Sequence, residues 1–102
     1  MTHDSHVYGK INNEAGMRRV FTEIRQDVAN AETRPVLTKL YRRAGDLIAL
    51  TYAPSWQEKF GSEEATGLRA IGEDEFCKTA REINHRAALV GTWPDYREKW
   101  GH

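Results

Sequence analysis

The order of apolar and polar positions predicts a helical protein. From Asn13 onward, apolar residues recur every three or four positions, which is the spacing of one face of a helix. The apolar positions of the first expected helix are Met17, Val20, Phe21, Ile24 and Val28. No stretch alternates with the period of two that a half-buried strand would have. The pattern therefore predicts an all-α fold.

Capping signals delimit the first two helices. Asn12 or Asn13 offers a cap oxygen for the first, and Thr33 can cap the second. Pro35 then falls in the first turn, where a helix does not need the missing N–H, and Pro54 ends the pattern. Between the two prolines the apolar stripe of the second helix consists of Val36, Leu37, Leu40, Tyr41, Ala44, Leu47, Ile48 and Thr51.

Two further helical segments follow. Ser55 and Glu58 have the spacing of a capping box, and Gly61 is a typical residue after a helix end, so we expect a short helix between them. Residues 62–72 contain two glycines and predict at most two turns. A fourth strong segment is expected from Glu73 and Asp74 to a stop at residue 91, with apolar positions Phe76, Ala80, Ile83, Ala87 and Val90.

The short helix has a second copy in the sequence. Residues 54–61 and 94–101 both read proline, a capping residue, an aromatic, a long polar residue, Glu, Lys, an aromatic and Gly. The match predicts two related units, each a long helix, a proline break and a short aromatic helix. We therefore expect a compact bundle of four to five helices in a single domain over residues 12–102, preceded by a flexible arm over residues 1–11.

The repeated segments concentrate aromatic residues, and two interpretations of them stay open. Within each segment two aromatics stand four residues apart, on one face of a helix. Either these faces complete a core that is poor in aliphatic residues, or part of them docks on another protein, because Trp and Tyr are favoured interface anchors. The predicted interaction surface consists of Trp56, Phe60, Trp93, Tyr96 and Trp100.

Composition narrows the class of protein. The 102 residues include 15 Lys and Arg and 15 Asp and Glu, and this balance argues against a dedicated nucleic-acid or anionic-membrane binder. No apolar run reaches the roughly 20 residues of a membrane span. The lone Cys77 excludes an intramolecular disulfide, and we expect it to pack as a small apolar residue. With no signal segment at its start, the chain is expected to be a cytoplasmic protein, and bacterial.

Two small groups of residues could form a metal-binding or a DNA-binding site. Glu82 and His85 share a helix face and could bind a metal ion, although one copy supplies half of a carboxylate-bridged bundle site. His85 cannot serve Cys77 as a base, because eight helical residues separate them by about 12 Å. The basic doublets, which a helix-turn-helix would use, are Arg18 with Arg19 and Arg42 with Arg43.

These observations favour a small non-catalytic accessory or adaptor protein. Its expected partner is another protein or a second copy of itself, with a homodimer possible and no membrane. No phosphate loop, paired cysteine motif or hydrolase elbow is present, so we expect no cofactor and lean against enzymatic activity. The alternative is a metal-dependent bundle enzyme or metal carrier that uses Glu82 and His85 across a dimer. A third hypothesis, with nucleic acid an unlikely partner, is a small DNA-binding regulator.

Overall fold

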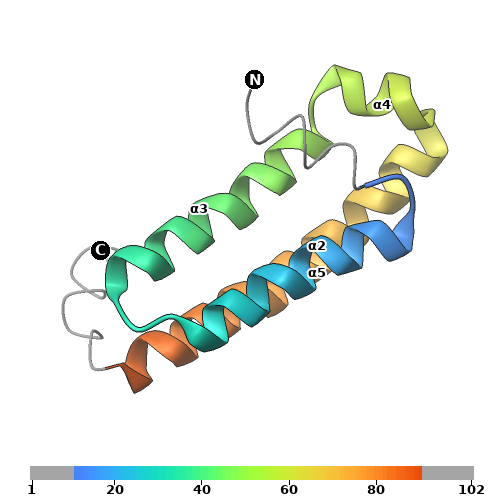
Figure 1. The fold of residues 1–102 in the computed structure, drawn as a ribbon. Coiled ribbons are helices and arrows are strands. Elements are labelled where there is room, and N and C mark those ends of the chain that lie inside the picture. Colours follow the sequence, from blue (N-terminus) through green and yellow to red (C-terminus); the bar gives the residue numbers. More distant parts are fainter. Residues whose placement is uncertain (1–10, 91–102) are drawn as a thin grey trace.

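The computed structural model describes residues 11–90, and these form an all-α helical bundle. The helices are α2 (Glu14–Asn30), α3 (Arg34–Thr51), α4 (Pro54–Phe60) and α5 (Ser62–Leu89) (Figure 1). Residues 11–90 contain no strand. The predicted fold class is therefore confirmed. The second copy of the repeated segment lies outside the described residues, so the two related units remain a prediction.

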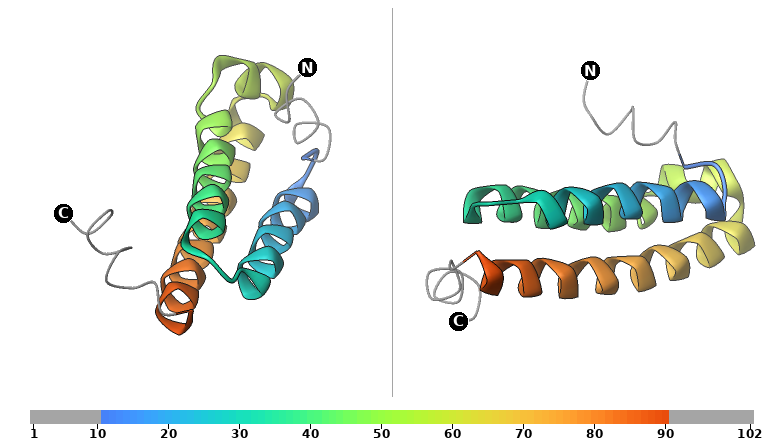
Figure 2. Two further views of the ribbon diagram at one scale, coloured as in Figure 1. Left: turned by 60° about the vertical axis from the view of Figure 1, so that its left-hand side comes forward. Right: turned by 60° about the horizontal axis from the view of Figure 1, so that its bottom comes forward.

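The long helices α2 and α5 run in the same direction, and α3 runs opposite to both (Figure 2). The contacts that α2 makes with α5 follow the same order along both helices, as they do in a parallel pair. Arg18 of α2 donates to Glu75 of α5, and further along Arg86 of α5 donates to the carbonyl of Ala31, just after α2. The short helix α4 lies across the end of the bundle where α3 ends and α5 begins.

Local signals place three of the helix ends where the sequence predicts them. The Asn13 side chain accepts a hydrogen bond of 2.9 Å from the backbone N–H of Gly16, so it caps α2. Thr33 is the N-cap of α3, with Pro35 in the first turn, although its side chain makes no cap hydrogen bond. Gly61 ends α4 with a φ of 82°, a conformation that favours glycine.

The predicted capping box is wrong. Helix α4 begins at Pro54, its N-cap is Ala53, and no side chain caps it. The backbone N–H of Trp56 instead donates to the carbonyl of Ala53 at 3.0 Å. The reason is that Pro54 is preorganised for the first helical position, so the helix starts before Ser55 can act as its cap.

The predicted break over residues 62–72 is also wrong, because α5 is one continuous helix of 28 residues. A helical glycine costs up to about 1 kcal/mol relative to alanine, and the burial of Ala65 and Leu68 against the bundle offsets this cost. Gly72 is itself buried, and a Cβ there would lie 3.3 Å from the Met17 side chain and 3.5 Å from that of Ile48. It therefore allows close packing between helices, which sequence propensity cannot reveal.

A single apolar core runs between the helices and includes residues from all four. Ile11, the last residue of the predicted arm, belongs to it at 1% exposure, and Lys59 of α4 lies 3.4 Å from its carbonyl. The remaining buried apolar residues are Met17, Val20, Phe21, Ile24, Val28, Ala31, Leu37, Leu40, Ala44, Leu47, Trp56, Ala65, Leu68, Ile83 and Ala87. Among residues 11–90, no helix is both long and apolar enough to cross a bilayer.

Candidate interaction surface

Tyr52 is an exposed aromatic residue that is held firmly in place. Its side chain is 60% exposed at the end of α3, and its hydroxyl donates a hydrogen bond to the carboxylate of Glu73 on α5. The guanidinium of Arg69 lies over the ring, 4.5 Å from its centroid. Arg69 is in turn fixed by two hydrogen bonds, of 2.9 and 2.6 Å, to the carbonyl of Thr51. The ring is therefore presented to solvent from a rigid base.

Tyr41 extends the exposed aromatic surface along α3. It is 37% exposed, and its ring centroid lies 5.7 Å from that of the half-buried Phe76 on α5. Tyr41 and Tyr52 are separated by about three helical turns, so they lie on the same side of α3, about 16 Å apart. The set of Tyr41, Tyr52, Arg69, Glu73 and Phe76 is called the tyrosine face below.

The contacts of Tyr52 also change the pKa of its hydroxyl. The hydrogen bond to Glu73 raises the pKa of the Tyr52 hydroxyl, and partial desolvation and the negative charge of Glu73 raise it further. The nearby Arg69 lowers the pKa by less, so the net change is upward. Tyr52 is therefore a neutral hydrogen-bond donor at physiological pH.

A buried ion cluster joins α2 to α5. The Glu75 side chain is 3% exposed, with Oε2 2.9 Å from Arg18 Nη1 and Oε1 2.9 Å from Arg25 Nη1. Lys78 Nζ lies 3.3 Å from Oε2, and Thr79 Oγ1 donates to the Glu75 carbonyl at 2.9 Å. Burial raises the pKa of Glu75, but the hydrogen bonds and charges of Arg25 and Lys78 lower it more. The carboxylate therefore stays ionised and links the helices.

Sequence reasoning missed both Glu75 and the tyrosine face. It assigned Glu73 and Asp74 to a helix start and gave Glu75 no role, because it divided α5 at Gly72. Read as one helix, α5 places Glu75 and Thr79 on the same face as its apolar residues, so their burial was detectable. The exposure of Tyr52 was not detectable, since it depends on how the chain turns into α4.

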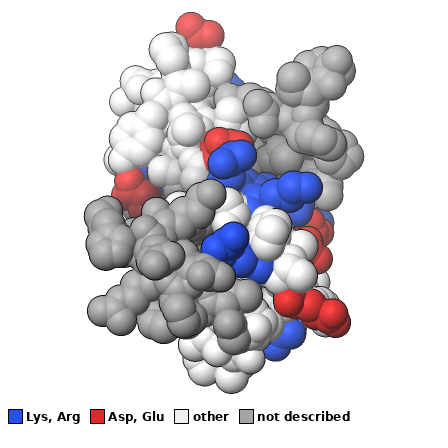
Figure 3. All heavy atoms as spheres, turned by 90° about the vertical axis from the view of Figure 1, so that its left-hand side faces the viewer, with Lys and Arg blue, Asp and Glu red and all other residues white. Residues whose placement is uncertain are grey.

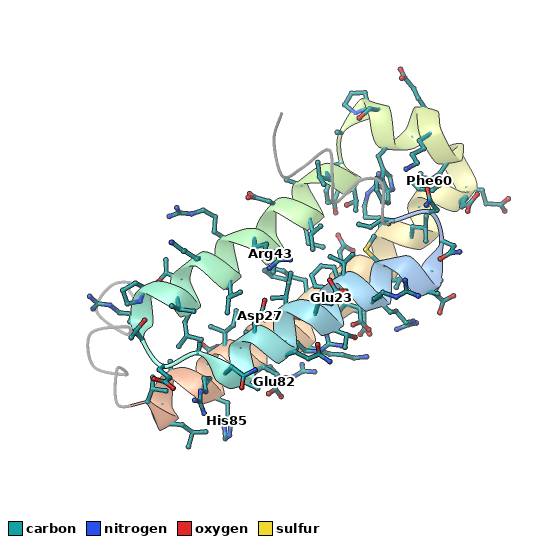
Figure 4. The ribbon with its side chains drawn as sticks, viewed as in Figure 1. Glu23, Asp27, Arg43, Phe60, Glu82 and His85 are labelled. Atoms are coloured by element: carbon teal, nitrogen blue, oxygen red, sulfur yellow. The ribbon has the colours of Figure 1, made fainter. Side chains whose placement is uncertain are left out.

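The aromatic residues predicted as an interaction surface have different locations. Trp56 is fully buried and donates Nε1–H to the carbonyl of Ala65 at 3.3 Å, so it is a core residue and not part of a surface. Phe60 is half-buried, with its ring 4.6 Å from that of Trp56 and the ammonium of Lys59 5.1 Å away (Figure 4). Trp93, Tyr96 and Trp100 lie outside the described residues.

The two predicted metal ligands are exposed to solvent, but they do not form a complete metal site by themselves. Glu82 and His85 are both exposed on the C-terminal half of α5 (Figure 4). Within residues 11–90, no three residues of the kinds His, Cys, Asp and Glu gather closely enough to hold a metal ion. A tetrahedral metal site uses three or four protein ligands, so any site here needs ligands from elsewhere. Cys77 is exposed, which corrects its predicted packing in the core.

The two basic doublets make separate contacts. Arg18 of the first doublet contacts Glu14 and Glu75, whereas Arg43 of the second contacts Asp27 of α2 at 3.5 Å. The other member of each doublet, Arg19 or Arg42, is exposed. On the side of the molecule drawn in Figure 3, Lys and Arg side chains gather near the middle with Asp and Glu side chains around them. A DNA-binding role stays a prediction that no contact here supports.

Comparisons with known proteins add no function to this geometry. The chain matches no protein-family model, and searches of curated proteins and of solved structures found no significant similarity. The fold defines the class of the protein, an all-α helical bundle.

Proposed function

We propose that the protein is a small non-catalytic adaptor that binds another protein, or a second copy of itself, through the tyrosine face. The observation that carries this proposal is the geometry of Tyr52, which is 60% exposed and yet held by Arg69 and Glu73. A tyrosine ring supplies a large amphipathic contact area and is enriched at binding hot spots. An exposed ring with fixed contacts at its base can serve as such an anchor.

Preorganisation supports the proposal energetically. Ordering a flexible side chain on binding costs about 0.5–1.5 kcal/mol, and a ring that is already ordered avoids this cost. Tyr41 is steadied in the same way by its contact with Phe76, so the face offers two anchors on one side of α3. Arg69, which lies over the Tyr52 ring, adds a positive charge to the face, and Glu73, which accepts the hydrogen bond of the Tyr52 hydroxyl, adds a negative charge. The expected partner surface is therefore apolar at its centre and carries hydrogen-bonding groups at its edge.

Site-specific cross-linking tests the proposal. A photoreactive phenylalanine analogue is placed at Tyr52, and in a matched control at Gln26, which is exposed on α2. Irradiation in the cells that naturally contain the protein should give a discrete adduct with the first variant and none with the second. Sedimentation velocity over a range of concentrations identifies a second copy as the partner. Equal labelling at both positions, together with a monomer at every concentration, would refute the proposal.

The metal-dependent alternative is tested with the same purified protein. Glu82 and His85 are free to bind an ion only if a second copy or another chain completes the ligand set. Native mass spectrometry after incubation with zinc, manganese or iron(II) measures subunit number and bound metal together. A metal-bound dimer that is lost in Glu82→Gln and His85→Gln variants would favour this alternative over the adaptor.

A further inference from the structure

One side of α5 faces away from the other long helices. In the right-hand view of Figure 2, α2 and α3 both lie on the same side of α5. On the opposite side, seven positions follow the three- and four-residue spacing of one helix face, and all seven are exposed. We call this set the outer face of α5, and it consists of Thr66, Ala70, Glu73, Cys77, Arg81, Asn84 and Ala88.

The outer face carries two opposite charges, placed symmetrically about its middle residue. Glu73 stands four residues before Cys77, and Arg81 stands four residues after it. Each charged residue is therefore about one turn, or about 6 Å along the axis, from the centre of the face. The other members of the outer face are uncharged and small or of medium size. Side chains of this kind allow another helix to approach closely, because the distance between packed helices depends on the side chains at the contact.

This arrangement of charges is complementary to itself when two copies of α5 run in opposite directions. If the two Cys77 residues face each other, Glu73 of each copy lies opposite Arg81 of the other copy. A parallel pair would instead place Glu73 opposite Glu73 and Arg81 opposite Arg81, and like charges across an interface repel. One two-fold axis forms both ion pairs at once, as in other isologous dimers.

Both charged groups are able to form these pairs. Arg81 is exposed, and within residues 11–90 its side chain makes no ion pair or hydrogen bond. Glu73 is also exposed and accepts a hydrogen bond from the Tyr52 hydroxyl through Oε2. A carboxylate has several acceptor positions, so Glu73 can accept from an arginine as well.

We propose that a second copy of the chain binds along the outer face of α5, antiparallel to it, about a two-fold axis at Cys77. The two ion pairs between Glu73 and Arg81 set the direction and the register of this dimer. The dimer does not depend on the adaptor function, because the outer face shares only Glu73 with the tyrosine face.

Charge exchange tests the proposal. Glu73→Arg leaves only positive charges on the outer face, and Arg81→Glu leaves only negative ones. We therefore expect each variant alone to dimerise with a Kd at least about tenfold higher than that of the unmodified protein. An equimolar mixture of the two variants should dimerise again, because both ion pairs then form between unlike copies. Sedimentation velocity over a range of concentrations measures these changes, and Glu82→Arg, at an exposed position elsewhere on α5, is the matched control that should dimerise normally.

Cys77 tests the register of the dimer directly. Mild oxidation with copper phenanthroline in air should link two unmodified chains, because residues that face each other at the axis can reach the Cα separation of about 5.5–6 Å that a disulfide needs. The control is the double variant Cys77→Ser with Glu82→Cys, which moves the thiol by five residues and about 140° around the helix. Its cross-linking should be much slower.

Three results would overturn the proposal. The first is a protein that stays monomeric at every concentration and does not cross-link through Cys77. The second is a dimer that both Glu73→Arg and Arg81→Glu retain. The third is a mixture of the two variants that associates no better than either alone, while circular dichroism shows that both are folded. A cross-link from Tyr52 to another protein that persists in Arg81→Glu would keep the adaptor function separate from the loss of the dimer.

Discussion

Replacing Glu75 with glutamine tests the ion cluster between α2 and α5. The substitution keeps the size of the side chain and removes the charge that Arg18, Arg25 and Lys78 all contact. Hydrogen bonds to a charged group are each worth about 1.5–3 kcal/mol, and breaking a fully buried pair costs about 3–5 kcal/mol. Here the side chains of Arg18 and Lys78 are each 44% exposed and can be rehydrated. We therefore expect Glu75→Gln to lower the free energy of unfolding by about 2 kcal/mol at neutral pH.

The same variant predicts how stability depends on pH. Because the pKa of Glu75 is lowered in the folded protein, its contribution is fully present above the unfolded value of about 4.3. The contribution is lost as the pH falls through the folded pKa, where the carboxylate takes up a proton. The difference between the unmodified protein and Glu75→Gln should therefore be largest at neutral pH. It should shrink towards zero in strongly acidic solution.

Urea unfolding followed by far-UV circular dichroism, repeated over a series of pH values, measures both effects. Glu82→Gln is the matched control, since it makes the same change at an exposed position of the same helix. It should change the free energy of unfolding by less than about 0.5 kcal/mol. If Glu75→Gln lowers the free energy of unfolding at neutral pH by no more than this control does, the ion cluster does not stabilise the protein. A difference that stays constant with pH would show that charge is not its cause.

Other substitutions probe the packing. Gly67→Ala should stabilise the protein by up to about 1 kcal/mol in urea unfolding, since its added Cβ meets nothing within 4 Å. Gly72→Ala should stabilise the protein by less than Gly67→Ala does, or destabilise it, because the added Cβ would lie 3.3 Å from the Met17 side chain. Trp56→Ala should cost about 3–5 kcal/mol in the same assay, as a fully buried Trp is lost. Asp27→Asn should cost under about 1 kcal/mol, since its ion pair with α3 is exposed.

Much of the fold could be predicted from the sequence because local signals agreed with the packing. Asn13 and Thr33 stand at helix starts, and Gly61 adopts the positive φ that favours glycine. The prediction failed where tertiary contacts decide the outcome. Gly72 looks like a helix breaker in isolation, yet a close approach of Met17 and Ile48 explains a glycine within α5.

The candidate site was less predictable than the fold. A capping residue followed by an aromatic does not reveal whether the ring is buried, and Trp56 is buried because α4 folds back onto Ala65. Tyr52, in contrast, is exposed because the turn after α3 leaves it beside Arg69 and Glu73. Exposure thus depends on the path of the chain between helices, which periodicity within helices does not describe.

The ion cluster also explains how a core with few aliphatic residues can hold one arrangement of helices. Arg18 and Arg25 stand seven residues apart, two turns of α2, and both reach the same carboxylate of Glu75 from either side. A shift of α2 by one turn along α5 would take one arginine out of reach and leave the carboxylate underpaired in a buried position. Apolar contacts alone discriminate weakly between such registers, because they are not directional. We infer that Glu75 fixes the parallel register of α2 and α5, and through it the base from which α3 presents the tyrosine face.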